Sequence, residues 1–272
     1  MKRPFCPGYP LLLAVASVLL ASSSARADGG VDAEPAADNS GFTVLSNATN
    51  VTHWGLGVGA GVEASPYVRG DTKYTPIPLI SFDDKWIHAI GTTIDLKIGN
   101  WDNVSVALRG NYALGDGYKN DDAPILNGMQ NRNPTFWYGP ALAWKTGYGT
   151  LSADYLLGGN RGERASIDYS KSFDFGKFSV QPYGGVEWLS SDYVNYYYGV
   201  QASEARAGRP EYTGTAAYDV SLGTRLNYSL TRQQKVVLDV GVKHFTSGIT
   251  DSPIVGRSYV PAARLAYIYQ FN

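Results

Sequence analysis

The chain has little charge, few histidines and one cysteine. Charged residues make up 17% of its 272 positions, against roughly 25% in a typical soluble domain, so part of its surface need not face water. The net charge of −1 provides no basic face of the kind that nucleic acid requires. His53, His88 and His244 lack the spacing of a zinc site. We expect no nucleic-acid partner, no metal centre and no cofactor.

The N-terminus has the layout of a signal peptide. Lys2 and Arg3 precede an apolar stretch at residues 11–20, and Ala25 and Ala27 flank Arg26 as a small-x-small cleavage site. The apolar stretch is too short to cross about 30 Å of hydrocarbon. Cys6 precedes that stretch, so a mature chain has no disulfide. We predict a signal peptide at residues 1–27 and a flexible N-terminal segment at residues 28–50, which is polar and without period.

Residues 28–272 contain no run of eighteen apolar residues, so a membrane role must use strands. What the sequence does contain is alternation: Tyr218, Val220 and Leu222 alternate with Asp219 and Ser221. The same period of two recurs at residues 103–114, 177–188, 234–244 and 258–271. These segments run for about 10–16 residues, whereas soluble strands average five or six. Aromatic residues gather near the segment ends, as in the girdles of membrane barrels.

Loop lengths alternate between short and long. Tight turns are expected near residues 100–103, 147–149, 174–177 and 231–233, and long connections at 116–133, 190–214 and 247–257. Outer-membrane barrels place short turns in the periplasm and long loops outside. For short and long connections to alternate over an even number of strands, residues 160–162 must form a connection on the outer side. Residues 86–99 must then form two short strands, bent near Gly91. A single strand there explains the alternation of Trp86, Ile90 and Ile94 better, but it breaks the parity.

We therefore predict an all-β fold over residues 51–272, a transmembrane antiparallel up-and-down β-barrel of about 12 strands (10–12). Charges of both signs occupy the strand faces opposite the apolar ones. At mid-membrane, basic side chains facing lipid would each cost roughly 2–4 kcal/mol. The candidates for lining the lumen are Glu63, Arg109, Lys145, Asp154, Glu187, Asp219, Arg225, Asp239, Lys243 and Arg264, with Asp95 and Lys97 on the same faces.

Two interpretations of these charges remain open. They can form a structural ion-pair network that fills the lumen, or they can line a selective pore. Twelve strands lie between small filled barrels and open porins, and we expect a plugged or very narrow lumen. The glycines at 55, 57, 59 and 61 fall on one strand face with no helix following, so we interpret them as lumen-facing rather than nucleotide-binding.

The sequence offers no catalytic group that we would assign. His244 and Ser247 are three residues apart, and three steps along a strand reverse the side-chain face. A Ser–His nucleophile is therefore disfavoured at this position. We predict that the protein is not an enzyme.

Several short motifs, in order from residue 65 to residue 271, resemble the MipA/OmpV family of outer-membrane proteins. They include Pro66, Tyr67, Gly70, Asp71, Pro76 and Pro78, then Tyr198, Gly199 and Val200, and later Asp251, Ser252 and Pro253. The alternating ending Tyr267-x-Tyr269-x-Phe271 is also similar, although Asn272 follows the aromatic residue that usually ends such chains. Pro76 and Pro78 lack N–H donors and suit a strand edge, a strand start or a bulge.

The resemblance implies a barrel in the outer membrane of a Gram-negative cell, in contact with its lipid. It implies two kinds of function. One family member is described as a scaffold that joins a lytic transglycosylase to a bifunctional murein synthase, and other members are treated as porins for small solutes. The resemblance supplies no catalytic residues. We expect a non-enzymatic scaffold for murein-processing enzymes, with a narrow porin or channel for small solutes or ions as the alternative.

Overall fold

The structure is a computed structural model that describes residues 40–42 and 50–271. The predicted signal peptide, and all of residues 28–50 except 40–42 and 50, lie outside the described residues. Within the described part of the chain, no helix has both the length and the apolar character needed to cross a bilayer.

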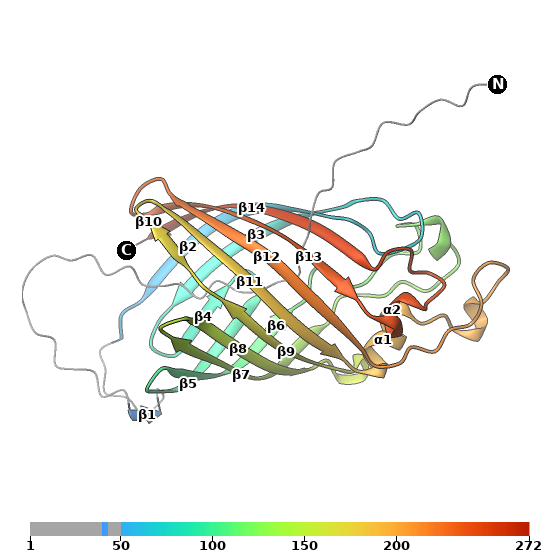
Figure 1. Cartoon of the computed structure of the whole chain (residues 1–272), viewed down its shortest axis with the longest axis horizontal. Coiled ribbons are helices and arrows are strands. Elements are labelled where there is room, and N and C mark those ends of the chain that lie inside the picture. Colours follow the sequence, from blue (N-terminus) through green and yellow to red (C-terminus); the bar gives the residue numbers. More distant parts are fainter. Residues whose placement is uncertain (1–39, 43–49, 272) are drawn as a thin grey trace, which may run out of the picture.

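Twelve strands form one antiparallel sheet that closes on itself (Figure 1). They are β2 (His53–Glu63), β3 (Lys73–Asp83), β4 (Ile87–Ile90), β5 (Thr93–Trp101), β6 (Val104–Tyr112), β7 (Phe136–Thr146), β8 (Gly149–Leu157), β9 (Glu163–Ser170), β11 (Phe178–Leu189), β12 (Ala217–Ser229), β13 (Gln234–Phe245) and β14 (Tyr259–Phe271). Two short strands extend the sheet: β1 (Ser40–Phe42) pairs with β5, and β10 (Phe173–Phe175) pairs with β11.

Consecutive strands of the barrel pair with each other, and the last pairs with the first. In the closing pair, β14 runs against β2 from Ala262 opposite Glu63 to Phe271 opposite Trp54. The rings of Trp54 and Phe271 stack with centroids 4.1 Å apart. The predicted up-and-down barrel of twelve strands is therefore confirmed.

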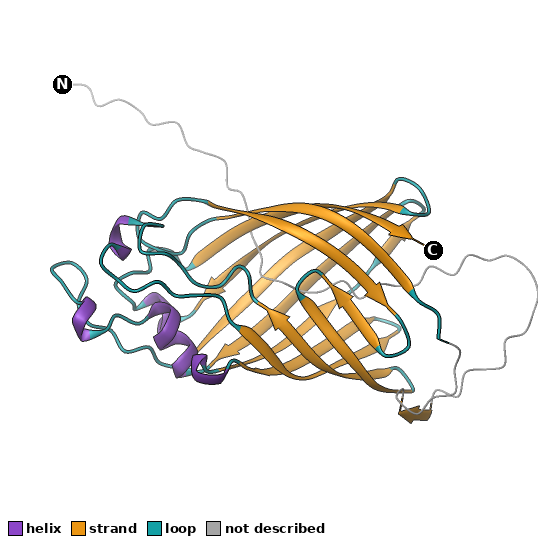
Figure 2. Cartoon of the chain, turned by 180° about the vertical axis from the view of Figure 1, so that it is seen from behind, coloured by secondary structure: helices purple, strands orange, loops and turns teal. Residues whose placement is uncertain are grey.

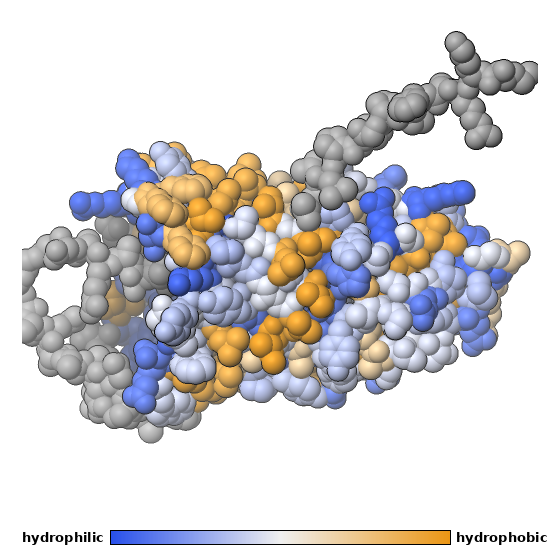
Figure 3. All heavy atoms as spheres, in the orientation of Figure 1, coloured by the Kyte–Doolittle hydropathy of each residue, from blue (hydrophilic) through white to orange (hydrophobic). Residues whose placement is uncertain are grey.

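Alternation along each strand separates two environments. On β12, Tyr218, Val220 and Leu222 point outward while Asp219 and Ser221 are buried inside. Val58 and Leu222 expose 69% and 59% of their surface, as expected where hydrocarbon rather than protein covers a side chain. The space-filling view shows apolar side chains gathered over the barrel wall (Figure 3). The inner face of the wall therefore collects the polar residues.

Residues 86–99, on which the even number of strands depended, contain a hairpin with a short first strand. β4 pairs with β5 from Ile87 opposite Leu96 to Ile90 opposite Thr93, and the turn between them contains Gly91 at φ +57°. Glycine adopts this left-handed conformation without steric cost. The prediction of two strands with a bend near Gly91 is confirmed, but only β4, with four residues, is short, whereas β5 has nine.

The tight turns and the long loops lie at opposite ends of the barrel, as the sequence predicted (Figures 1 and 2). The long loops, residues 64–72, 113–135, 190–216 and 246–258, pack into what we call the extracellular cap. The cap contains helix α1 (Ser191–Tyr198), helix α2 (Ser247–Thr250) and the 3-10 turns η2 (Pro124–Leu126) and η4 (Ala202–Glu204). A further 3-10 turn, η3 (Gly159–Arg161), joins β8 to β9 at this end.

Candidate functional site: a charged lumen beneath a loop cap

Arg109 is the centre of one charged group on the inner wall. Its Nε lies 2.8 Å from Asp95 on β5, and its Nη1 lies 2.9 Å from Asp154 on β8. Ser166 on β9 donates to the same Asp154 at 3.1 Å. Arg109 faces Asp95 directly in the strand register. These contacts tie side chains from four strands together across the inner surface.

A second group lies nearer the cap. Lys243 on β13 reaches Asp219 at 2.9 Å and Glu187 at 3.2 Å. Arg164 on β9 lies 3.5 Å from the same Glu187. Asp219 exposes only 2% of its surface. Unpaired charges so poorly solvated would be costly, and each of these carboxylates has a cation beside it.

The remaining lumen candidates are distributed between a third group and the two rims. Arg225 on β12 and Tyr183 on β11 both contact Asp239 on β13, at 2.9 Å and 3.0 Å. Arg264 lies 3.7 Å from Glu63 near the cap. Lys145 is exposed next to the turn between β7 and β8. Lys97, on the same faces, binds Asp83 at 2.7 Å.

Sequence reasoning missed Arg164 and Asp116. Arg164 and Ser166 alternate with Ala165 and Ile167, so the period of two could have placed Arg164 on the inner face. Asp116 lies in a loop, where no periodicity indicates a direction. Its placement depends on how residues 113–117 pass over the barrel mouth.

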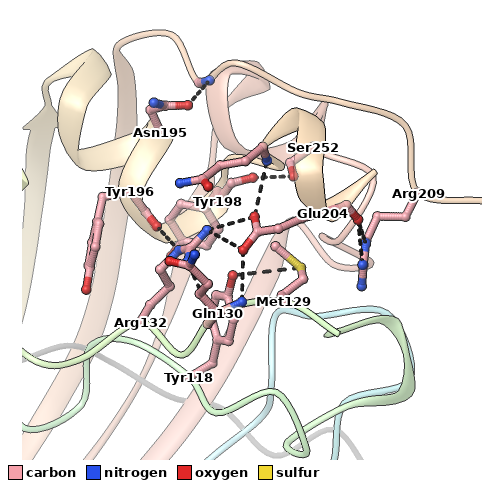
Figure 4. A network of polar contacts seen from close by, with 12 residues as sticks. Tyr118, Met129, Gln130, Arg132, Asn195, Tyr196, Tyr198, Glu204, Arg209 and Ser252 are labelled. Atoms are coloured by element: carbon pink, nitrogen blue, oxygen red, sulfur yellow. Dashed lines mark hydrogen bonds and ion pairs between the residues drawn. The ribbon is translucent and has the colours of Figure 1, made fainter. Parts of the chain in front are cut away.

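The extracellular cap has its own buried ion pair (Figure 4). Arg132 Nη2 lies 2.9 Å from Glu204 Oε2, and the two side chains expose 4% and 3%. Glu204 also accepts hydrogen bonds from the backbone N–H groups of Gln130 and Gln201. Burial opposes ionisation, but these hydrogen bonds and the charge of Arg132 hold the pKa of Glu204 below its usual value.

Arg209 reinforces the same contact between loops. Its guanidinium donates to the backbone carbonyls of Glu204, at 2.6 Å, and of Asn127, at 3.0 Å. Residues 113–135 and 190–216 are therefore joined by charge-assisted hydrogen bonds to backbone groups. The cap is a packed structure rather than a set of independent loops.

Two of the family motifs meet in the cap. Tyr67 packs edge-on against Tyr118, with centroids 5.0 Å apart, and lies 6.3 Å from Tyr198. The Gly256 N–H donates to the Pro66 carbonyl at 2.8 Å. Gly70 N–H closes a turn onto Tyr67, and Asp71 follows at the cavity described below. Residues 64–72 are thus held against residues 246–258.

The other loop motifs complete this packing. Tyr198 ends α1, and its carbonyl accepts a hydrogen bond of 2.6 Å from the Ser252 hydroxyl. Gly199 N–H bonds to Asn195, and Val200 pairs with Tyr212. Asp251 is exposed and Pro253 is half-buried just after α2. Pro76 and Pro78 lie apart from these loops, inside β3.

A cavity of about 380 Å³ lies between the cap and the second charged group. Its roof contains Tyr67, Tyr193, Tyr197 and Tyr198. Asp116 enters it from the side, and its buried Oδ2 has no hydrogen-bond partner among the described residues. Burial raises the pKa of Asp116. The cavity thus combines aromatic faces with an incompletely satisfied carboxyl group.

His244 does not contribute to this cavity. It belongs to the outward face of β13, next to Leu238 and Val242, and its ring packs against Tyr259 with centroids 4.4 Å apart. Ser247 begins α2, two residues after the end of β13. In the described residues, no group of three or more His, Cys, Asp and Glu side chains has the arrangement of a metal site.

Comparison with known proteins identifies the family to which this barrel belongs. The family model described as MltA-interacting protein MipA matches residues 56–271. The chain belongs to the MipA family. Among curated MipA relatives, the outer membrane protein Omp26La of Vibrio anguillarum is 29% identical, over 83% of this chain and 91% of its own length.

Two further relatives carry names that bear on location and function. Outer membrane protein OmpV of Vibrio cholerae is 31% identical, over 58% of this chain and 64% of its own length. The MltA-interacting protein of Escherichia coli K12 is 26% identical, over 84% of this chain and 96% of its own length. The predicted resemblance is confirmed, and this MipA-family barrel is an outer-membrane protein.

Proposed function

We propose that the protein is a non-enzymatic anchor that holds murein-processing enzymes at the inner surface of the outer membrane. The observation that carries the proposal is the match to a protein named for its interaction with MltA, over 96% of that relative's length. The partner classes we propose are a lytic transglycosylase and a murein synthase.

The inner wall and the cap favour a protein-binding role over free passage of solutes through the lumen. Three groups of paired charges project into the lumen, and the cap packs its own apolar core over one mouth. The paired charges and the packed cap hold side chains in contact with one another, whereas in an open pore the same side chains would contact water. A barrel of this kind offers stable surfaces at its two ends.

The partner surface is proposed to be the turn end. Murein lies in the periplasm, and the tight turns of the barrel reach that side. Tyr148, in the turn between β7 and β8, exposes 81% of its surface, and Phe175, before the turn to β11, exposes 65%. Exposed aromatic side chains are frequent anchors at protein interfaces.

Affinity capture tests this proposal. The solubilised barrel should enrich a lytic transglycosylase and a murein synthase over an unrelated barrel. Tyr148→Ser combined with Phe175→Ser should lower that enrichment by at least about tenfold, because two proposed anchors are lost. Tyr74→Ser is the matched control, because Tyr74 is 77% exposed at the opposite end of the barrel. Equal recovery by the barrel and by the unrelated control would reject the proposal.

The second candidate is a narrow channel for small solutes or ions. The cavity inside the barrel, with its charged lining, favours it. Planar-bilayer recordings distinguish the two candidates: discrete conductance steps support the channel, and a bilayer that remains sealed at high protein load rejects it.

A further inference from the structure

The barrel wall is incomplete on one side. β3 pairs with β4 only at Ser81–Asp83. The β4–β5 turn at Gly91 follows directly on the cap side of that contact. Among the residues that the structure describes, positions 74–79 of β3 therefore have a strand partner on the β2 side alone. Figure 2, which faces this part of the wall, shows a hairpin whose turn ends part-way along the barrel. The gap lies in the half of the wall nearer the cap.

Pro76 and Pro78 lie on the unpaired edge. The Ile80 carbonyl accepts a hydrogen bond from Gly91 on the β4 side. Backbone groups along a strand alternate in direction, so the nitrogens and carbonyls of Pro76 and Pro78 point to that side as well. Proline has no N–H to donate, which makes an added strand a poor occupant.

The cavity under the cap adjoins the upper rim of the gap. The cavity lining includes Thr72 and Lys73 at the start of β3, and Asn111, Ala113 and Gly115 at the end of β6 and beyond. Lys73 Nζ donates to the Gly115 carbonyl at 3.0 Å, so one contact bridges the upper rim of the gap. Behind the unpaired edge, Ile77 and Leu79 belong to the inward face of β3. On this face of β3 they follow Lys73, which lines the cavity, and Thr75.

The cavity is suited to a positive charge. The carboxylates of Glu187 and Asp219 are neutralised by Lys243 and Arg164, but Asp116 has no such ion pair in the described residues. Asp71 and Asp121 add further acidic side chains to the lining. The roof contains four tyrosine rings, and the faces of aromatic rings attract ammonium groups.

We infer that this opening admits an amphiphile from the outer leaflet, with its alkyl chain against Ile77 and Leu79 and its ammonium head in the cavity beside Asp116. The ligand class is a single-chain alkylammonium. This inference is independent of the anchoring of murein enzymes, because it concerns the opposite end of the barrel and an unrelated ligand.

Photolabelling in phosphatidylcholine nanodiscs tests the inference. The probe is dodecylammonium with a diazirine on its chain, and the matched comparison is dodecyl sulfate with the same diazirine. Peptide mass spectrometry should place the ammonium label on residues 72–80 and 111–117, with the sulfate label at least about tenfold weaker there. Equal labelling by the two probes, or label spread evenly over the exposed wall, would overturn the inference.

Variants separate the head site from the opening. Asp116→Asn keeps the shape of the side chain and should reduce ammonium labelling about tenfold, the contribution of one charge-assisted contact. Thr75→Phe should block the gap and remove the label from residues 111–117. Ser81→Phe is the control, because Ser81 lies on the same inward face of β3 but below the gap, where β4 pairs. A shift in electrophoretic mobility on heating (heat modifiability) confirms that each variant is folded. Unchanged labelling in both folded test variants contradicts the inference.

Discussion

At the scale of single residues, the cap depends on a charge pair that water barely reaches. Arg132 and Glu204 come from two different long loops and are almost completely buried. Burying two charges is expensive, and hydrogen bonds to backbone groups of Gln130, Gln201 and Tyr196 offset part of that cost. The pair therefore fixes which backbone segments meet.

Glu204→Gln should loosen the cap by about 3–5 kcal/mol, because it leaves the Arg132 charge buried without its partner. Limited proteolysis of the reconstituted barrel, with cleavage mapped to residues 113–135 and 190–216, measures the change. Glu211→Gln is the control, since Glu211 is exposed in the same loop. Equal protection of the two variants would show that the pair does not hold the cap.

Acid should loosen the cap in the same way. The pKa of Glu204 in the folded protein is lower than its ordinary value of 4.5, so its contribution to stability is complete above that value. The contribution declines as the pH falls through the lower, folded-state pKa. Protease sensitivity of the cap should rise in that acidic range for the natural chain, whereas Glu204→Gln should lack this dependence.

At the scale of elements, strand register brings the charges of the inner wall together. Glu187 on β11 is directly opposite Asp219 on β12, and Lys243 on β13 is opposite Ser221, two positions further along. Two carboxylates facing each other repel, and the ammonium group of Lys243 lies between them and compensates. The three strands depend on one another through this contact.

Lys243→Met should therefore destabilise the barrel by about 3–5 kcal/mol, because two carboxylates lose their shared cation. Urea unfolding in lipid vesicles, followed by tryptophan fluorescence, measures the loss. Adding Asp219→Leu should recover part of the stability, because one of the two opposed charges is then removed. An additive further loss in the double variant would show that these side chains do not interact.

How far the sequence predicts this structure depends on periodicity. Alternation placed Arg109, Glu187 and Lys243 on one face of long strands, and turn spacing with parity located the hairpin at Gly91. The cap could not be predicted, because the contact of Arg132 with Glu204 joins loops without any period. Asp116 was missed for the same reason. The unpaired edge of β3 was indicated only by the two prolines, whose position within the barrel required the register of β4.

At the scale of the whole molecule, charge is unevenly distributed around the cavity. Its lining contains Glu63, Asp71, Asp116, Asp121, Asp122, Glu187 and Asp219 against Lys73, Arg164, Lys243 and Arg264. An acidic excess in a poorly solvated space attracts cations and repels anions. Any ion that crosses the barrel meets this field.

Residual current through the reconstituted barrel should therefore be cation-selective. Reversal potentials in a potassium chloride gradient measure the preference, and Asp71→Asn with Asp116→Asn should shift the potential toward zero. Asp174→Asn, in the turn end of the barrel, is the control. Anion preference in the natural chain would contradict this reading of the cavity.

The seam between β14 and β2 has a consequence for biogenesis. The stacked rings of Trp54 and Phe271 come from the first and last strands of the barrel. Until both strands have been synthesised and exported, the sheet has two strand edges without a partner. A fragment that lacks β2 or β14 cannot close into a barrel, because this pair joins the two ends of the sheet. Closure of the barrel therefore requires both β2 and β14, so only a chain that contains both strands forms a wall in which the first and last strands are paired.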